Sequence, residues 1–177
     1  METQKNVWTI DKKHSTIEFS VRHMMVSTVK GRFREYDGNI VLDPVKLEDS
    51  SASVTVDVAS ISTEEPDRDN DLKSEKFFDV QKYPKISFQS SRIYRDGDEV
   101  VVEGKLTIRD VTKDIRVRGQ LEGPVKDPYG MTRVGYDGEA TVNRKDFGLK
   151  WNVVLEGGGV MVGDAVKINV HFELISS

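Results

Sequence analysis

Short runs in which apolar and polar residues alternate recur along most of the chain. They occupy residues 17–22, 29–34, 51–61, 86–88, 100–108, 115–121, 134–142 and 166–174. A period of two is typical of half-buried antiparallel strands, and the β-branched residues that dominate the runs suit a pleated surface. Turn sequences separate the runs, and Asp96-Gly97 between two of them predicts a tight hairpin. We therefore expect about eight antiparallel strands.

One segment, Asp67 to Tyr83, breaks this period. It is acidic at its start and contains apolar residues without alternation. Asn70 or Asp71 is a candidate N-cap for a short helix. The helix should end before Pro84, because the residue preceding a proline avoids the α region. The pattern as a whole predicts an all-β domain with one short helix.

About eight strands with one apolar face each form a sandwich or close into a barrel. A barrel of that size has a lumen that is either packed by side chains or wide enough for one small ligand. Small residues recur on the apolar phase of the runs, at Gly31, Ala52, Gly104, Gly119, Gly138 and Ala140. They are consistent with an internal cavity and equally with glycines that curve the sheet.

Length and charge limit the classes of partner. The 177 residues and 20.0 kDa fit one domain, which we assign to residues 1–177. The chain has 26 basic and 30 acidic residues and a formal net charge of −4. This acidity argues against a nucleic-acid partner, which usually requires a basic surface. No uninterrupted apolar run exceeds three residues, so no transmembrane segment is expected.

Recognisable catalytic and metal-binding motifs are absent from the sequence. The chain has no cysteine, no GxSxG elbow, no phosphate-binding loop and no HExxH motif. The three histidines do not have the spacing of a metal site. We expect no catalytic residues, no cofactor, no metal and no enzyme activity. Residues 1–8 lack the apolar core of a signal peptide, which predicts a cytoplasmic protein, or a periplasmic one if a leader has been removed.

Two polar residues continue an apolar phase. His23 follows Ile17, Phe19 and Val21 at spacing two, and Arg144 follows Val142 in the same way. A cation at the mouth of an apolar lumen would suit a ligand with an apolar body and a polar or anionic head. The alternative is that the strands have already ended and both side chains lie in solvent. Met24 and Met25, which follow His23, could line an adaptable entrance or fill gaps in the core.

Four segments, in order along the chain, resemble motifs of the YceI-like family. They read WTIDKKHSTIEFSVRH at 8–23, RDNDLKSEKFFDVQKYPKISFQS at 68–90, GKLTIRDVTK at 104–113 and NRKDFGLKW at 143–151. The resemblance extends over nearly the whole chain. It implies a lipocalin-like antiparallel β-barrel whose long apolar tunnel holds an extended isoprenoid or similar lipid chain. It also implies a binding protein without catalysis, a possible homodimer and, for many members, export to the periplasm.

Candidate ligand-binding residues combine the family motifs with the phase of the strands. They are Phe19, His23, Phe33, Val54, Val56, Phe77, Phe78, Phe88, Leu106, Val142, Arg144, Phe147, Leu149 and Trp151. His23 and Arg144 are the candidates for the polar head. Phe77 and Phe78 are expected to close one end of the barrel from the short helix. Ordinary core packing is the alternative for the apolar members.

We therefore expect a barrel that binds an isoprenoid or fatty amphiphile in its lumen, for transport or storage and without catalysis. One alternative is a packed barrel that serves as an interaction or stress-response module. A further alternative is an enzyme that acts on the bound lipid. A filled core would favour the packed barrel, and turnover of the lipid would reveal the enzyme.

Overall fold

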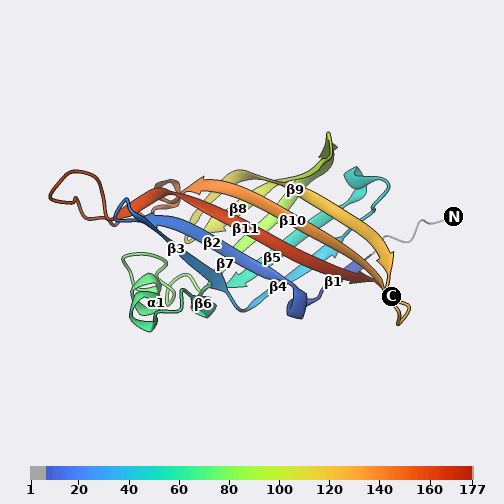
Figure 1. The fold of residues 1–177 in the computed structure, drawn as a ribbon, viewed down its shortest axis with the longest axis horizontal. Coiled ribbons are helices and arrows are strands. Elements are labelled where there is room, and N and C mark those ends of the chain that lie inside the picture. Colours follow the sequence, from blue (N-terminus) through green and yellow to red (C-terminus); the bar gives the residue numbers. More distant parts are fainter. Residues whose placement is uncertain (1–6, 177) are drawn as a thin grey trace.

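A single antiparallel sheet makes up most of the computed structural model, which describes residues 7–176 (Figure 1). Its strands are β1 (Val7–Ile10), β2 (Thr16–His23), β3 (Ser27–Phe33), β4 (Tyr36–Val41), β5 (Ser51–Asp57), β6 (Ile61–Ser62), β7 (Lys85–Asp96), β8 (Glu99–Ile108), β9 (Val111–Lys126), β10 (Thr132–Asn143) and β11 (Val162–Ser176). The helix α1 spans Pro66–Lys73, and four short 3-10 helices cover Lys12–His14, Leu47–Asp49, Val58–Ser60 and Arg144–Phe147.

The sheet closes because β1 pairs with both β4 and β11. One 3-10 helix separates β1 from β2, and these two strands lie end to end against β11 on one side and against β4 and β3 on the other. If β1 and β2 count as one strand and β3 and β4, which also follow each other end to end, count as another, the described residues form a closed meander of eight strands, with β6 as a short addition beside β3. The predicted antiparallel barrel with one short helix is confirmed.

The two ends of the barrel differ. The start of β1 and the end of β11 lie at one end of the barrel, which we call the end with the termini, and α1 with the segment 144–161 lies at the other, which we call the lid end (Figure 1). At the end with the termini, Trp8 is buried and its indole N–H donates to the carbonyl of Leu42 at 3.0 Å. Leu47, from the loop between β4 and β5, is also buried there. Neither Trp8 nor Leu47 lines the lumen, so both act as filling at that end.

The helix lies earlier than the sequence predicted, and the proposed caps Asn70 and Asp71 are inside it. It begins at Pro66, whose missing N–H and fixed φ suit the first turn. The Asp69 carboxylate then accepts hydrogen bonds from the backbone N–H and the hydroxyl of Thr63, at 2.8 and 2.6 Å. These contacts fasten the start of the helix to the preceding strand, a tertiary effect that cap preferences along the sequence do not contain.

The predicted strand at 51–61 also ends early. Strand β5 stops at Asp57, and the chain turns through Val58–Ser60 before the short strand β6. The hydroxyl of Ser60 donates to the carbonyl of Asp57 at 2.6 Å, and the N–H of Val58 donates to the carbonyl of Pro84 at 3.0 Å. The turn therefore starts the excursion that leads through β6, which pairs with the end of β3, to α1 at the lid end.

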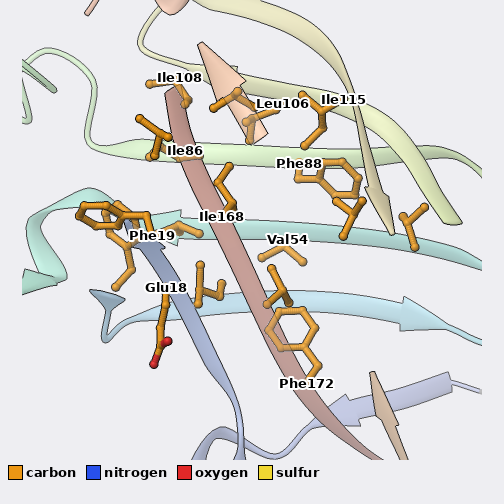
Figure 2. A pocket seen from close by; sticks show the side chains of 18 of the residues that line it. Glu18, Phe19, Val54, Ile86, Phe88, Leu106, Ile108, Ile115, Ile168 and Phe172 are labelled. Atoms are coloured by element: carbon orange, nitrogen blue, oxygen red, sulfur yellow. The ribbon is translucent and has the colours of Figure 1, made fainter. Parts of the chain in front are cut away.

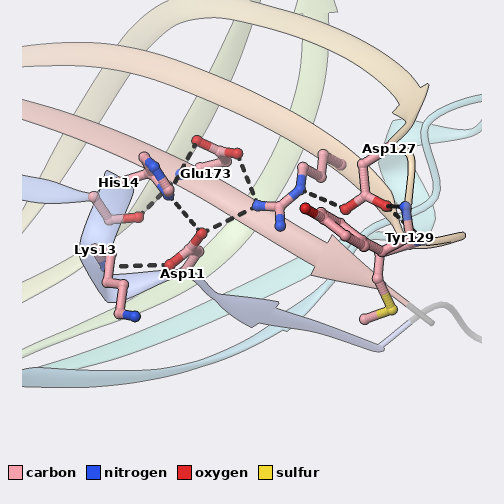
Figure 3. Close-up of polar contacts among 9 residues, drawn as sticks. Asp11, Lys13, His14, Asp127, Tyr129 and Glu173 are labelled. Carbon is pink, nitrogen blue, oxygen red and sulfur yellow. Dashed lines mark hydrogen bonds and ion pairs between the residues drawn. The ribbon is translucent and has the colours of Figure 1, made fainter.

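Arg133 on β10 joins the elements that meet at the end with the termini, and Figure 3 labels its three acidic partners, Asp11, Asp127 and Glu173. Its guanidinium donates to Asp127 at 2.9 Å, to Asp11 at 3.1 Å and to Glu173 at 2.9 Å. The ring of His14 lies 2.7 Å from the Asp11 carboxylate. This network connects the segment after β1 with β10 and β11, which is where the barrel closes. The hydrogen bond with His14, together with that from Arg133, lowers the pKa of the Asp11 carboxyl against the opposing effect of burial.

The network should stabilise the barrel at neutral pH and lose its effect in acid. A lowered pKa in the folded state means that the contribution of Asp11 is present above its usual pKa of 3.8 and is lost as the pH falls below it. We predict that Arg133→Met lowers the urea midpoint at pH 7 and that the gap to the parent protein narrows at about pH 3.

The matched control is Arg118→Met, which removes a guanidinium on β9 that pairs with the exposed Asp96. It should change the urea midpoint little at either pH, because exposed ion pairs contribute little. Equal shifts for the two variants at pH 7 would contradict a special role for Arg133.

Candidate functional site

The barrel encloses an apolar cavity of about 270 Å³. Its walls come from the inward phase of the strands and from α1 and the segment after β10. On β11 alone, lining residues run from Val162 to Leu174, which corresponds to roughly 40 Å along the strand. A cavity of this volume spread over such a length is long and narrow, so its shape matches an extended chain better than a compact ring system.

Most of the predicted site residues line this cavity. They are Phe19, Phe33, Val54, Val56, Phe77, Phe78, Phe88, Leu106, Val142, Arg144, Phe147 and Leu149. Figure 2 labels Phe19, Val54, Phe88 and Leu106 among the side chains that surround the cavity. The inward orientation inferred from strand phase is therefore present at these positions, and their contact with a ligand stays a prediction.

Further lining residues were not singled out from the sequence. From the wall they include Ile17, Ile86, Ile108, Ile115, Ile168 and Phe172, and from the helix Leu72. Those on strands share the apolar phase with the predicted residues, so the alternation already contained the signal. Leu72 carried no such signal, because only the fold brings α1 over the end of the barrel.

His23 and Trp151 do not line the cavity. His23 is the last residue of β2 and pairs with Ser27 at the turn to β3. Trp151 packs behind Phe77, with the two rings edge to face at 5.4 Å, and the ammonium of Lys76 lies over its indole ring at 5.4 Å. Trp151 thus supports the lid from outside, which strand phase alone could not reveal because residue 151 is outside any strand.

Phe77 and Phe78 close the lid end, from the turns that follow α1. Phe78 packs edge to face on Phe33 of the wall at 6.2 Å between ring centres, and Phe77 packs on Trp151. The guanidinium of Arg109 donates to the carbonyls of Phe77 at 3.4 Å and Gly148 at 3.3 Å. The lid is therefore two segments, one on each side of Arg109, that are fastened to each other and to the wall.

Arg144 lines the cavity, yet its guanidinium is directed at the backbone. It is only 4% exposed and donates to the carbonyls of Gly163, Leu149, Trp151 and Val162. Four of its five N–H groups are thereby used, and Asp164 lies 3.7 Å away. The sequence assigned Arg144 to an anionic head group. The structure instead gives it the role of a clamp that orders residues 149–163.

Few polar groups remain for a ligand inside the lumen. The hydroxyl of Tyr136 donates to the carbonyl of Val100 at 2.9 Å, and burial raises the pKa of this phenol, so it stays neutral. Glu18 borders the cavity, but its side chain is exposed and Figure 2 shows the carboxylate pointing away from the other labelled side chains. The lumen is therefore narrow and apolar, and it has almost no free hydrogen-bonding groups for a ligand.

Aromatic rings lie over glycines on the wall. A Cβ at Gly31 would lie 2.3 Å from the ring of Phe19, which faces it across β2 and β3. In the same way, a Cβ at Gly104 would lie 2.6 Å from the ring of Phe88. The sequence left two explanations for the small residues, an internal cavity and curvature of the sheet. The structure adds a third for Gly31 and Gly104: they let large rings lie flat along the wall instead of projecting into the lumen.

One group of side chains has the spacing of a metal site. Ligand atoms of Asp11, His14 and Glu173 lie within 4.8 Å of one another, near the termini. The guanidinium of Arg133 donates to both carboxylates and so occupies the place of a cation (Figure 3). The group is best understood as part of the ion-pair network described above.

No helix in residues 7–176 is both long and apolar enough to cross a lipid bilayer.

Comparison with known proteins gives consistent results at the level of family and fold. The family model described as YceI-like domain matches residues 8–174. A UPF0312 protein of Pseudomonas aeruginosa is 35% identical over 148 residues, which cover 82% of this chain and 78% of that protein.

Two solved structures share the fold. Burkholderia cenocepacia BcnA superposes with a TM-score of 0.80 at 24% identity, covering 95% of this chain and 99% of that one. A polyisoprenoid binding domain from Saccharophagus degradans gives a TM-score of 0.69 at 14% identity, covering 98% and 100%.

A substitution at Gly31 tests whether the contact between Phe19 and this glycine keeps the ring out of the lumen. Gly31→Ala places a methyl group where the ring now lies, so the ring must turn into the lumen and reduce its volume. We predict weaker uptake of an apolar fluorescent dye, measured by titration, and partial recovery when Phe19→Leu is added. Gly135→Ala is the control, because a Cβ there meets no atom within 4 Å. Unchanged uptake by Gly31→Ala would contradict this role of the glycine.

Proposed function

Because the chain belongs to the YceI-like domain family, we propose that its barrel binds the extended hydrocarbon chain of an isoprenoid or fatty amphiphile, for transport or storage and without catalysis. The single observation that carries this proposal is the long apolar cavity in the lumen. Barrels of about eight strands are wide enough for one such ligand.

Energetics favour an occupied lumen. An empty apolar cavity of about 270 Å³ costs roughly 6 kcal/mol, from the destabilisation measured per unit of cavity volume in engineered cores. That cost is comparable with the whole stability of many domains. Burial of a hydrocarbon contributes roughly 0.8 kcal/mol per CH₂, so a chain of about ten carbons supplies about 8 kcal/mol against the cost of association. A hydrocarbon needs no hydrogen bonds, and the lumen offers almost none.

The chain of the ligand, and not its head group, is the feature we propose to be recognised. Arg144 is the one cation that lines the cavity within residues 7–176, and it already donates to four backbone carbonyls. A prenyl alcohol and the matching prenyl phosphate are therefore expected to bind with similar affinity. The name of the Saccharophagus degradans neighbour, a polyisoprenoid binding domain, supports an isoprenoid as the first class to test.

The alternatives receive less support. A packed-barrel interaction module requires a filled core, and the cavity does not favour it. An enzyme acting on the lipid requires acid, base or nucleophilic groups beside the chain. The lining side chains are apolar except for Glu18, Tyr136 and Arg144, whose polar groups point away or are hydrogen-bonded to the backbone.

A chain-length series tests the proposal. Ala52 on β5 lines the lumen, and Ala52→Phe should block the cavity at that level. For the parent protein we predict affinity that rises from geraniol through farnesol to geranylgeraniol, because each added unit buries more apolar surface. For Ala52→Phe this gain should be lost for the longer chains. Titration calorimetry or displacement of a bound dye measures both series.

The matched control is Ser53→Phe, the next residue along β5, which lies outside the cavity lining. It should preserve the chain-length dependence of the parent protein. Identical dependence for parent and Ala52→Phe would reject the lumen as the binding site.

A further inference from the structure

Five exposed apolar side chains gather at the lid end. They belong to two segments, the turn between β2 and β3 and the loop before β11, and we call them the apolar tip: Met24, Met25, Val26, Val153 and Val154. Val26 and Val154 are about four-fifths exposed, at 81% and 80%. In Figure 1 both segments project beyond the barrel, at the end away from the labelled termini.

The two segments of the apolar tip are joined. The N–H of Met24 donates to the carbonyl of Met161 at 2.7 Å. The sulfur of Met25 lies so close to Gly159 that a Cβ there would be 2.7 Å away, so a larger residue at 159 would displace the Met25 side chain. The loop itself is held by Asn152, whose side chain bonds both the N–H and the carbonyl of Val162. The two segments therefore form one ordered surface.

The turn itself is unusual. Met24 and Met25 have φ values of +52° and +65°, in the left-handed region where Asn and Gly are usual. The adjacent Val26 continues the apolar run into the start of β3. A turn with strained backbone that still displays three apolar side chains to solvent points to a function for the side chains.

The apolar tip is continuous with the cavity. Val21, Leu149 and Val162 line the lumen, and they lie at the bases of the two segments that carry the tip. Any molecule that covers the tip would therefore lie beside the lid.

Charge on the two segments that carry the apolar tip differs from that of the whole chain. Residues 20–30 and 148–163 together contain three basic residues, Arg22, Lys30 and Lys150, and one acidic residue, Glu156, whereas the chain carries −4. Within residues 7–176 no carboxylate lies at ion-pair distance from any of these three cations. The guanidinium of Arg22 donates to the carbonyl of Met25 at 3.1 Å, which holds one cation beside the tip.

We propose that the apolar tip docks on the surface of an anionic lipid bilayer, with its aliphatic and thioether side chains in the interface and Arg22, Lys30 and Lys150 facing the lipid phosphates. Apolar side chains flanked by cations are the combination that binds such surfaces. The inference rests on the proposed function for its purpose, since a hydrocarbon ligand resides in membranes and the tip borders the lid through which it would pass.

Vesicle flotation with the full chain tests the proposal. We expect binding to vesicles of phosphatidylcholine with phosphatidylglycerol, and weaker binding to phosphatidylcholine alone. The double variant V26D/V154D removes two exposed side chains without opening the core, and should weaken binding roughly tenfold or more. The matched control V45D/V125D makes the same charge change at exposed positions toward the end with the termini, and should bind as the parent does.

Several outcomes would overturn the proposal. The parent protein could fail to bind either vesicle, or the two double variants could lose binding equally. Light scattering, which reports the oligomeric state, tests a third outcome. If the parent protein is a dimer that binds no vesicles and V26D/V154D is a monomer, the tip is an interface between two copies of the chain. Uptake of geranylgeraniol from solution, measured on the same variants, distinguishes membrane docking from ligand binding in the lumen. V26D/V154D should lose vesicle binding and still take up geranylgeraniol.

Discussion

Closure of the sheet through β1 is the constraint on which the rest of the molecule depends. Because β1 pairs with β4 on one side and β11 on the other, the inward side chains of the described strands face one common interior, most of which is the lumen. The number of strands then sets a lumen that side chains can line without filling. The ion pairs of Arg133 lie where the first and last strands meet and stabilise the arrangement that makes the cavity possible.

The cavity exists because large side chains lie against the barrel wall and not along the barrel axis. Phe19 and Phe88 lie flat over Gly31 and Gly104, so two of the largest rings contribute wall and not filling. The two ends are then sealed differently. Trp8 and Leu47 fill the end with the termini, whereas the lid end is closed by Phe77 and by loops clamped through Arg144.

The sequence predicted the fold and the wall of the site well, because both follow from one periodicity. Alternation identified the strands, and its phase identified inward residues such as Val54 and Leu106. What it could not predict lies in contacts within loops that follow no fixed spacing along the chain. The start of α1 depends on Asp69 bonding Thr63, and the role of Arg144 depends on four carbonyls that only the folded loop brings to it. Trp151 was assigned to the lumen by its motif, and the fold places it behind Phe77.

Native mass spectrometry of the purified protein, followed by organic extraction and lipid identification, tests the central claim most directly. The account predicts a stoichiometric adduct that is retained under gentle ionisation and extracts as an isoprenoid or fatty chain. A protein that carries no adduct and takes up none of the isoprenoid or fatty chains added back to it would contradict the account.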